Sequence, residues 1–275
     1  MAVASRKMET IETHDMDRYR APALDKGFDV LEILADENGG LTRSEISRLL
    51  GKSTSEIYRV LDRLQTRQYV VHSTVGGRYS LGLKLYALAH RYPPMNRLIA
   101  EALPLIQHVA DAAGQSCHLT VYDRADLLVI AQVDGPGPCA ISVRLGARVG
   151  LIDTSSGRTM LAFQTPEQRE HMLSEYARLN GEVAIDREML QADYEQIRAA
   201  GFSQTDSQQF LGITDITFPL YGPSGQAIAT LTCPCLRRID ERAAPPLDAV
   251  RKMLADTASR LSMLSEPARA VDPTG

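Results

Sequence analysis

The sequence lacks the features that mark a membrane protein, a secreted protein or a disulfide scaffold. No run of 18 or more apolar residues occurs in its 275 residues, so no transmembrane helix and no membrane partner are expected. The first 15 residues are polar and contain no apolar signal region, which predicts a cytoplasmic protein. Four cysteines are present without C-x-x-C spacing, and we expect free thiols. They are Cys117, Cys139, Cys233 and Cys235.

Internal repeats, low-complexity tracts and residue patterns of an active site are also missing. The pair Cys117-His118 resembles a nucleophile and its base, but adjacent residues on a strand point to opposite faces and cannot meet one substrate. We therefore expect a protein that is not an enzyme and needs no cofactor. A metal sensor that uses Cys117, Cys233 and Cys235 is an alternative, although C-x-C alone lacks the spacing of a structural zinc site.

Two helix starts of capping-box form lie close together between residues 41 and 81. The first is Thr42-x-x-Glu45 and the second is Ser53-x-x-Glu56, each followed by apolar residues at helical spacing. Only Gly51 and Lys52 separate the two patterns, and so short a turn is typical of a helix-turn-helix. Strand-like residues then flank Gly76-Gly77, which predicts a β-hairpin. Helix, turn, helix and hairpin together indicate a winged helix.

The second of these helices has a polar face that suits a DNA groove. Hydroxyls and N–H groups near a helix start can bind phosphate oxygens, an arginine can read a guanine edge, and a tyrosine can pack on sugar or a thymine methyl. The predicted DNA contacts are Thr42, Arg43, Ser44, Ser53, Thr54, Ser55, Tyr58, Arg59, Arg63 and Arg78.

Charge is distributed unevenly along the chain. Residues 39–92 contain nine Lys or Arg and three Asp or Glu, whereas the other 221 residues contain 21 basic and 31 acidic residues. The formal net charge of −4 therefore hides a basic module on an acidic body, as expected when phosphate contacts need positive charge only locally. A winged helix that binds only other proteins is the alternative interpretation.

The remaining pattern predicts five segments. Residues 1–20 read as a disordered arm, 21–81 as the winged helix, 82–94 as a joining helix, 95–265 as a second domain and 266–275 as a flexible tail. The first helix is expected to pack through Leu24, Phe28, Leu31 and Leu34. The joining helix, too short to be stable alone, is expected to pack on a second copy of itself.

The second domain alternates strand-like runs with a block of helices, which predicts an α+β fold with a largely antiparallel sheet. One long helix containing Pro104 should open it. Strands are predicted at 117–122, 127–133, 139–145, 213–221 and 226–233, and helices at 155–163, 166–179, 186–200 and 247–264.

Four features resemble the IclR family of bacterial transcription regulators: the winged-helix stretch, the short joining helix, the segment 149–162 (VGLIDTSSGRTMLA) and the segment 201–206 (GFSQTD) followed by Leu-Gly-Ile. The similarity covers about residues 22 to 264. It implies a dimer or dimer of dimers that reads operator DNA, either as a repressor or as an activator. It also implies a C-terminal GAF-like domain that binds a small organic acid from a catabolic pathway.

The resemblance places the effector between the sheet and the helix that follows the T-x-S-G segment. Thr154-Ser-Ser-Gly157 also indicates such a site by itself, since free N–H groups at a helix start bind carboxylates. The predicted effector contacts are Asp153, Thr154, Ser155, Ser156, Thr205, Asp206, Asp215 and Thr232.

This chain departs from the family pattern at several of these positions. Thr205 replaces the first acid of the family, Asp215 stands where a Cys is frequent, Pro234 replaces a hydroxyl residue, and Ile152 stands where many relatives have His. Extra acids at Asp153 and Asp215 disfavour a bare small acid such as glyoxylate unless an arginine compensates, so an aromatic acid is preferred. The arginines considered are Arg144 and Arg148. Alternatively, Asp153 only caps the helix and Asp215 faces solvent.

Overall fold

The computed structural model describes residues 21–91, 93–181, 185–237 and 245–264. The chain divides into two compact units, Met1–Tyr92 and Pro93–Gly275. The predicted arm at 1–20 and the tail at 266–275 lie outside the described residues. No helix of the described part is both long and apolar enough to cross a membrane.

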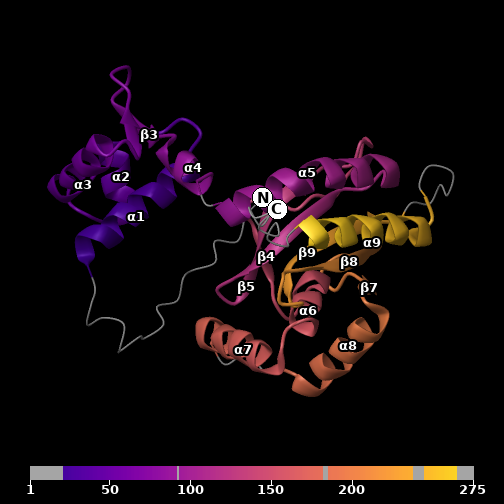
Figure 1. Cartoon of the computed structure of the whole chain (residues 1–275). Coiled ribbons are helices and arrows are strands. Elements are labelled where there is room, and N and C mark those ends of the chain that lie inside the picture. The colour runs from indigo at the N-terminus through magenta and orange to yellow at the C-terminus, as the bar shows by residue number, and fades with distance from the viewer. Residues whose placement is uncertain (1–20, 92, 182–184, 238–244, 265–275) are drawn as a thin grey trace, which may run out of the picture. The chain divides into compact units, whose positions relative to one another are not determined.

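Three helices and a small antiparallel sheet of strand order β1-β3-β2 form a winged helix-turn-helix in the first unit, as predicted (Figure 1). A buried apolar core that includes Ile46, Ile57 and Leu61 joins them. The elements are α1 (Pro22–Ala35), β1 (Leu41–Thr42), α2 (Arg43–Leu50), α3 (Thr54–Thr66), β2 (Val70–His72) and β3 (Arg78–Leu81).

The predicted capping boxes are confirmed at the starts of α2 and α3. The Thr42 hydroxyl accepts the N–H of Glu45 while the Glu45 carboxylate accepts the N–H of Thr42, and Ser53 and Glu56 repeat this exchange. Gly51 ends α2 in the left-handed conformation, with φ of 60°, which a glycine adopts without steric cost. The turn between the two helices is therefore fixed by local interactions.

The prediction for the packing face of α1 is wrong in part. Leu34 is buried as expected, but Leu24 and Phe28 are 56% and 51% exposed, and Val30 fills the core in their place. Val30 and Leu34 are four residues apart and share one face of the helix. Leu24 and Phe28 lie farther round the helix, away from that face, which apolar spacing alone did not reveal.

A short helix, α4 (Lys84–Ala89), ends the first unit. It is shorter than the predicted joining helix at 82–94, and Pro93 already begins the next helix. None of its residues is buried within the chain, and Leu83, Tyr86 and Leu88 are exposed.

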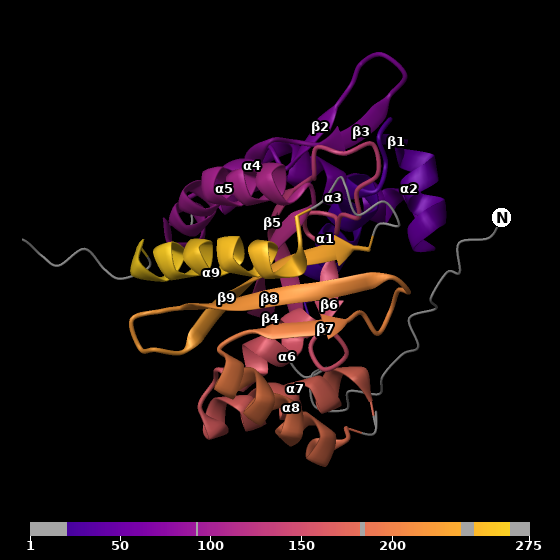
Figure 2. The ribbon, with the colours of Figure 1, turned by 90° about the vertical axis from the view of Figure 1, so that its right-hand side faces the viewer.

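The second unit contains a six-stranded antiparallel sheet of order β6-β5-β4-β9-β8-β7. α5 and α9 cover one face, and α6, with α7 and α8 beyond it, lies on the other (Figures 1 and 2). This is the expected α+β fold. The elements are α5 (Pro93–Ala113), β4 (Cys117–Asp123), β5 (Asp126–Val133), β6 (Arg148–Gly150), α6 (Ser155–Ala162), α7 (Pro166–Asn180), α8 (Arg187–Ala200), β7 (Ser203–Asp206), β8 (Ile213–Tyr221), β9 (Ala227–Leu236) and α9 (Leu247–Leu264).

Three strand assignments in the second unit differ from the sequence prediction, and one of them is β6, which the sequence did not indicate. Residues 139–145 form no strand: Ile141 and Val143 line a cavity, and the edge of β5 pairs with β6 instead. Residues 203–206 form β7, which pairs with β8 from Ser203↔Thr217 to Asp206↔Thr214. The polar sequence of β7 lacks the alternation that identifies a strand, so only its partner reveals it.

The packing of α1 can be tested by replacing a buried leucine and an exposed leucine with alanine in two separate variants. We expect Leu34→Ala to lower the free energy of unfolding by about 2 to 4 kcal/mol, because it opens a cavity in the core. Leu24→Ala should change it by less than about 0.5 kcal/mol, since that side chain is exposed. Urea denaturation of both variants measures the difference. Equal losses would contradict the observed packing face.

Candidate functional site

A chain of buried hydroxyl groups attaches the start of α6 to the sheet. The Ser155 Oγ donates to Ser203 Oγ at 3.0 Å and lies 2.9 Å from Thr217 Oγ1. Thr217 Oγ1 lies 3.0 Å from Thr232 Oγ1, which lies 2.7 Å from Ser156 Oγ. Because each hydroxyl has one hydrogen, the Ser155 donation makes Thr217, Thr232 and Ser156 donate in turn along the chain. The four hydroxyl hydrogens are therefore used within the protein.

Unlike these hydroxyl groups, the backbone N–H groups at the start of α6 can still donate to a ligand. The Thr154 side chain caps the helix by accepting the N–H of Gly157 at 3.1 Å, which leaves the N–H groups of Ser155 and Ser156 for other acceptors. Gly157 permits the close approach of the helix start to the backbone of Leu151, since a Cβ at residue 157 would lie 2.1 Å from the Leu151 carbonyl oxygen. An exposed pair of N–H groups at a helix start attracts an anion.

A cavity of about 100 Å³ opens beside this helix start. All eight residues predicted to contact an effector line it: Asp153, Thr154, Ser155, Ser156, Thr205, Asp206, Asp215 and Thr232. Apolar side chains form much of the remaining wall, namely Ile141, Val143, Val149, Phe210, Ile213 and Pro234. The cavity therefore combines amide donors with an apolar surface.

The cation of the cavity is Arg158, the one lysine or arginine among its described lining residues. Its guanidinium donates to the Ile152 carbonyl at 2.9 Å, to Asp193 at 2.7 Å and to the Gln208 side chain at 2.8 Å. Arg148 does not compensate the negative charge of the cavity. Its side chain bonds the backbone and carboxylate of Asp123 and does not line the cavity.

Asp153 and Asp215 occupy different positions in the cavity. Thr154, and not Asp153, caps α6, and the exposed Asp153 accepts a hydrogen bond from Gln209 at 3.3 Å. Asp215 lies near the start of β8 opposite Thr205, and burial raises the pKa of its carboxyl to about 6. The alternative in which Asp153 is only a cap and Asp215 faces solvent is therefore wrong.

His118 also lines the cavity, on β4, which the sequence did not predict. The side chain is 5% exposed, and its Nδ1 is buried without a hydrogen-bond partner. Burial lowers the pKa of His118 to about 4, so the ring is neutral near pH 7.

The three cysteines of the metal alternative lie in the apolar core on the other face of the sheet. Cys117, Cys233 and Cys235 are buried, and Cys233 Sγ lies 3.7 Å from Cys235 Sγ. Their surroundings raise the pKa of Cys233 and of Cys235, whereas a metal ligand must be the thiolate. Among the described residues, no group of three His, Cys, Asp or Glu could hold a metal ion.

In the first unit, five of the predicted DNA contacts line one open hollow: Arg43, Thr54, Ser55, Tyr58 and Arg59. Arg43 lies over the Tyr58 ring, with its central guanidinium carbon 5.6 Å from the ring centroid. Tyr58 is 52% exposed, and the other four residues are exposed too. Cations, hydroxyls and an aromatic ring thus face solvent together.

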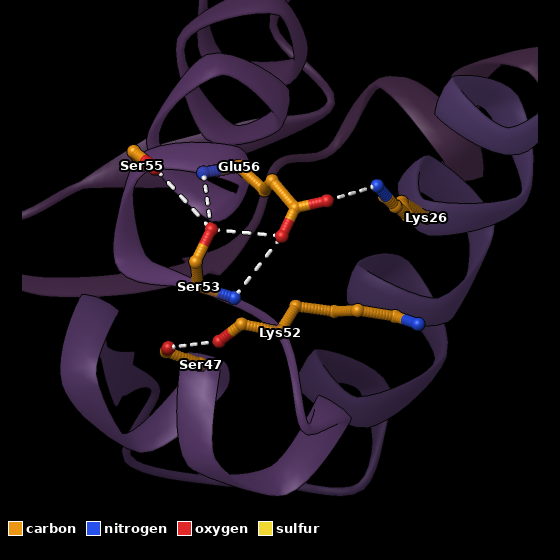
Figure 3. A network of polar contacts seen from close by, with 6 residues as sticks. All are labelled: Lys26, Ser47, Lys52, Ser53, Ser55 and Glu56. Carbon is orange, nitrogen blue, oxygen red and sulfur yellow. Dashed lines mark hydrogen bonds and ion pairs between the residues drawn. The ribbon is translucent and has the colours of Figure 1, made fainter.

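Other predicted DNA contacts take part in interactions within the unit. Ser53 Oγ donates to one carboxylate oxygen of Glu56 at 2.7 Å, and Lys26 Nζ donates to the other at 2.5 Å (Figure 3). Lys26 and Ser53 hold the pKa of Glu56 at about 2. Arg78 donates to the Gly40 carbonyl at 2.7 Å and to Glu45 at 3.3 Å. Thr42 bonds Glu45, whereas Ser44 and Arg63 are exposed.

Family models match both units. The C-terminal domain of the bacterial transcriptional regulator IclR matches residues 91–263, and the IclR helix-turn-helix domain matches residues 23–73. The chain belongs to the IclR family of bacterial transcriptional regulators. The IclR family consists of DNA-binding regulators with an effector domain, and not of enzymes.

Characterised IclR relatives are similar over most of their length. The transcriptional regulator KdgR of Escherichia coli is 28% identical over 222 residues, which are 79% of this chain and 84% of that protein. The acetate operon repressor of Salmonella typhimurium is 23% identical over 226 residues, 80% and 82% of the two chains.

Solved IclR structures share the fold. A homologue from Microbacterium hydrocarbonoxydans in complex with 4-hydroxybenzoate has a TM-score of 0.72 and 23% identity, covering 88% of this chain and 98% of that one. HmgR of Pseudomonas aeruginosa has a TM-score of 0.70 and 19% identity, with the same coverage.

The buried carboxyl of Asp215 makes stability depend on pH. Its folded pKa of about 6 exceeds the ordinary 3.8, so the stability that the protonated form provides is lost as pH rises through about 6. We expect Asp215→Asn to raise the free energy of unfolding at pH 8 by about 1 to 3 kcal/mol, and by less at pH 4.5.

Urea denaturation at the two pH values measures this effect, with Asp153→Asn at the exposed rim as the matched control. A gain from Asp215→Asn that is equal at both pH values would mean that burial of the charge is not its cause.

Proposed function

We propose that this chain regulates a catabolic operon by binding operator DNA through α2 and α3, and that a small aromatic acid in the cavity controls that binding. The DNA assignment is supported chiefly by the hollow in which Arg43, Thr54, Ser55, Tyr58 and Arg59 meet. The effector assignment is supported by the cavity at the start of α6.

On DNA, α3 would enter the major groove. Arg59 would then read a guanine edge, Tyr58 would pack on sugar or a thymine methyl, and Arg43 would bind phosphate. Arg78 is partly occupied by the Gly40 carbonyl and Glu45, so we assign it the positioning of the wing and a phosphate contact through its remaining N–H groups.

In the cavity, the effector carboxylate would lie at the N–H groups of Ser155 and Ser156, and its ring would lie against apolar residues such as Ile141 and Ile213. A two-carbon acid would leave this apolar wall uncovered. The described lining contains three acids and a single arginine, which also favours a ligand that has a large uncharged part beside its carboxylate. The 4-hydroxybenzoate complex of the Microbacterium homologue is a precedent for an aromatic acid in this fold.

The active form would be a homodimer or a dimer of dimers. α4 has no residue buried within its own chain, and a six-residue helix is marginal in water by itself. The exposed Leu83 at its N-cap and its own Tyr86 and Leu88 would therefore pack against a second copy. Such pairing would place two reading helices on two half-sites of the operator.

The DNA contacts predict different losses for two arginines. Arg59→Ala should weaken binding to a duplex selected by the protein from random sequence by about 1 to 3 kcal/mol, and should reduce its preference over scrambled DNA. Arg43→Ala should weaken binding to both duplexes alike, because a phosphate contact is independent of sequence.

Fluorescence anisotropy at one fixed salt concentration measures these affinities, with Arg178→Ala in the second unit as the control. If Arg59→Ala weakened selected and scrambled DNA equally, Arg59 would not read a base.

The cavity predicts which acids stabilise the protein. Benzoate and the hydroxybenzoates should raise the midpoint of thermal unfolding at millimolar concentration, whereas acetate and glyoxylate should not, because only a ring covers the apolar wall. Val143→Trp should abolish the rise by filling the cavity. A rise that persists in this variant would place the ligand elsewhere, and a rise only with glyoxylate would exclude the aromatic class.

A further inference from the structure

The Nδ1 atom of His118 is a buried polar atom without a hydrogen-bond partner. The His118 side chain is 5% exposed and lines the cavity, and no group of the described protein bonds its Nδ1 atom. A buried polar group without a partner costs free energy, and most such groups in proteins are satisfied. A partner supplied by a ligand removes that cost when the cavity is filled.

The sheet places His118 beside the helix start that would bind the carboxylate. His118 on β4 is paired with Thr232 on β9, and side chains directly opposite each other have Cβ atoms about 5 Å apart. Ser156 is attached to the same Thr232 by the 2.7 Å hydrogen bond. A compact ligand can therefore reach the N–H groups of α6 with one end and the imidazole with the other.

The chemistry of this end of the cavity favours a neutral polar group. Burial keeps the imidazole neutral, so it provides one N–H donor and one acceptor but no positive charge for a carboxylate. On the opposite side of His118, Gln132 of β5 has an amide oxygen that is also buried without a partner. A hydroxyl group can both donate and accept, which matches these surroundings.

We propose that the effector is a hydroxylated aromatic acid whose hydroxyl group bonds the His118 imidazole while its carboxylate lies at the start of α6. This inference rests on the proposed effector cavity and names the ligand group that the cavity selects. His118 is then the residue that distinguishes a hydroxylated acid from the same acid without the hydroxyl.

The test compares benzoate, 3-hydroxybenzoate and 4-hydroxybenzoate by isothermal titration calorimetry on the full chain. We expect the wild-type protein to bind one of the hydroxybenzoates about tenfold more tightly than benzoate, because without the hydroxyl the imidazole stays unpaired. In His118→Leu this ratio should fall below about threefold with benzoate affinity retained. His118→Asn, which supplies a side-chain amide that can donate and accept in place of the imidazole, should restore part of the ratio.

His171→Leu, at an exposed histidine of α7, is the matched control and should leave the ratio unchanged. Operator affinity without ligand, measured on each variant, shows that the fold is retained.

The possible failures separate the two proposals. If none of the three compounds binds the wild-type protein, the aromatic effector is wrong and this inference falls with it. If benzoate and the hydroxybenzoates bind equally, or if His118→Leu leaves the ratio intact, the effector site stands and the role of His118 is wrong. Equal loss of all three ligands in His118→Leu would show that the imidazole meets the carboxylate instead. Loss of stability without a changed ratio would show that His118 serves the packing of the domain and not the choice of ligand.

Discussion

The attachment of α6 to the sheet through buried hydroxyls is the interaction on which the effector domain depends. Ser155 and Ser156 bond three strands through Ser203, Thr217 and Thr232, so the helix start has one position relative to the sheet. Since those hydroxyls donate to one another, only the backbone N–H groups of the helix start remain for an anion. The same arrangement therefore gives every one of these hydroxyls a hydrogen-bond partner and leaves backbone N–H groups for a ligand. Gly157 makes the arrangement sterically possible.

The first unit uses the same physical device for a different purpose. Capping boxes at Thr42 and Ser53 consume side-chain hydroxyls to fix two helix starts, and Lys26 secures the second box through Glu56. The hollow beside α3 then displays exposed arginine, tyrosine and hydroxyl groups. For a ligand in one unit to alter DNA binding by the other, it must have different affinity for two arrangements of the protein.

Local signals explain which parts of this structure could be predicted from the sequence. Capping boxes, the Gly51 turn and the glycine hairpin are set by neighbouring residues, so the winged helix followed from them, and the T-x-S-G segment located the cavity. His118 and Arg158 were missed because their role depends on strand pairing and on contacts with distant residues such as Asp193. The segment 139–145 has strand-like composition but lines the cavity, and Leu24 fits helical spacing but not the core. In each case the place of the residue in the tertiary fold, which local spacing does not encode, decided the outcome.

The central claim is that effector and DNA affinities are linked. Anisotropy titrations of an operator duplex with and without saturating 4-hydroxybenzoate, paired with calorimetry of the ligand with and without saturating duplex, test it most directly. The account predicts that each partner changes the affinity of the other by one common factor of about fivefold or more, in the same direction. Ligand binding in the cavity that leaves DNA affinity unchanged would contradict it.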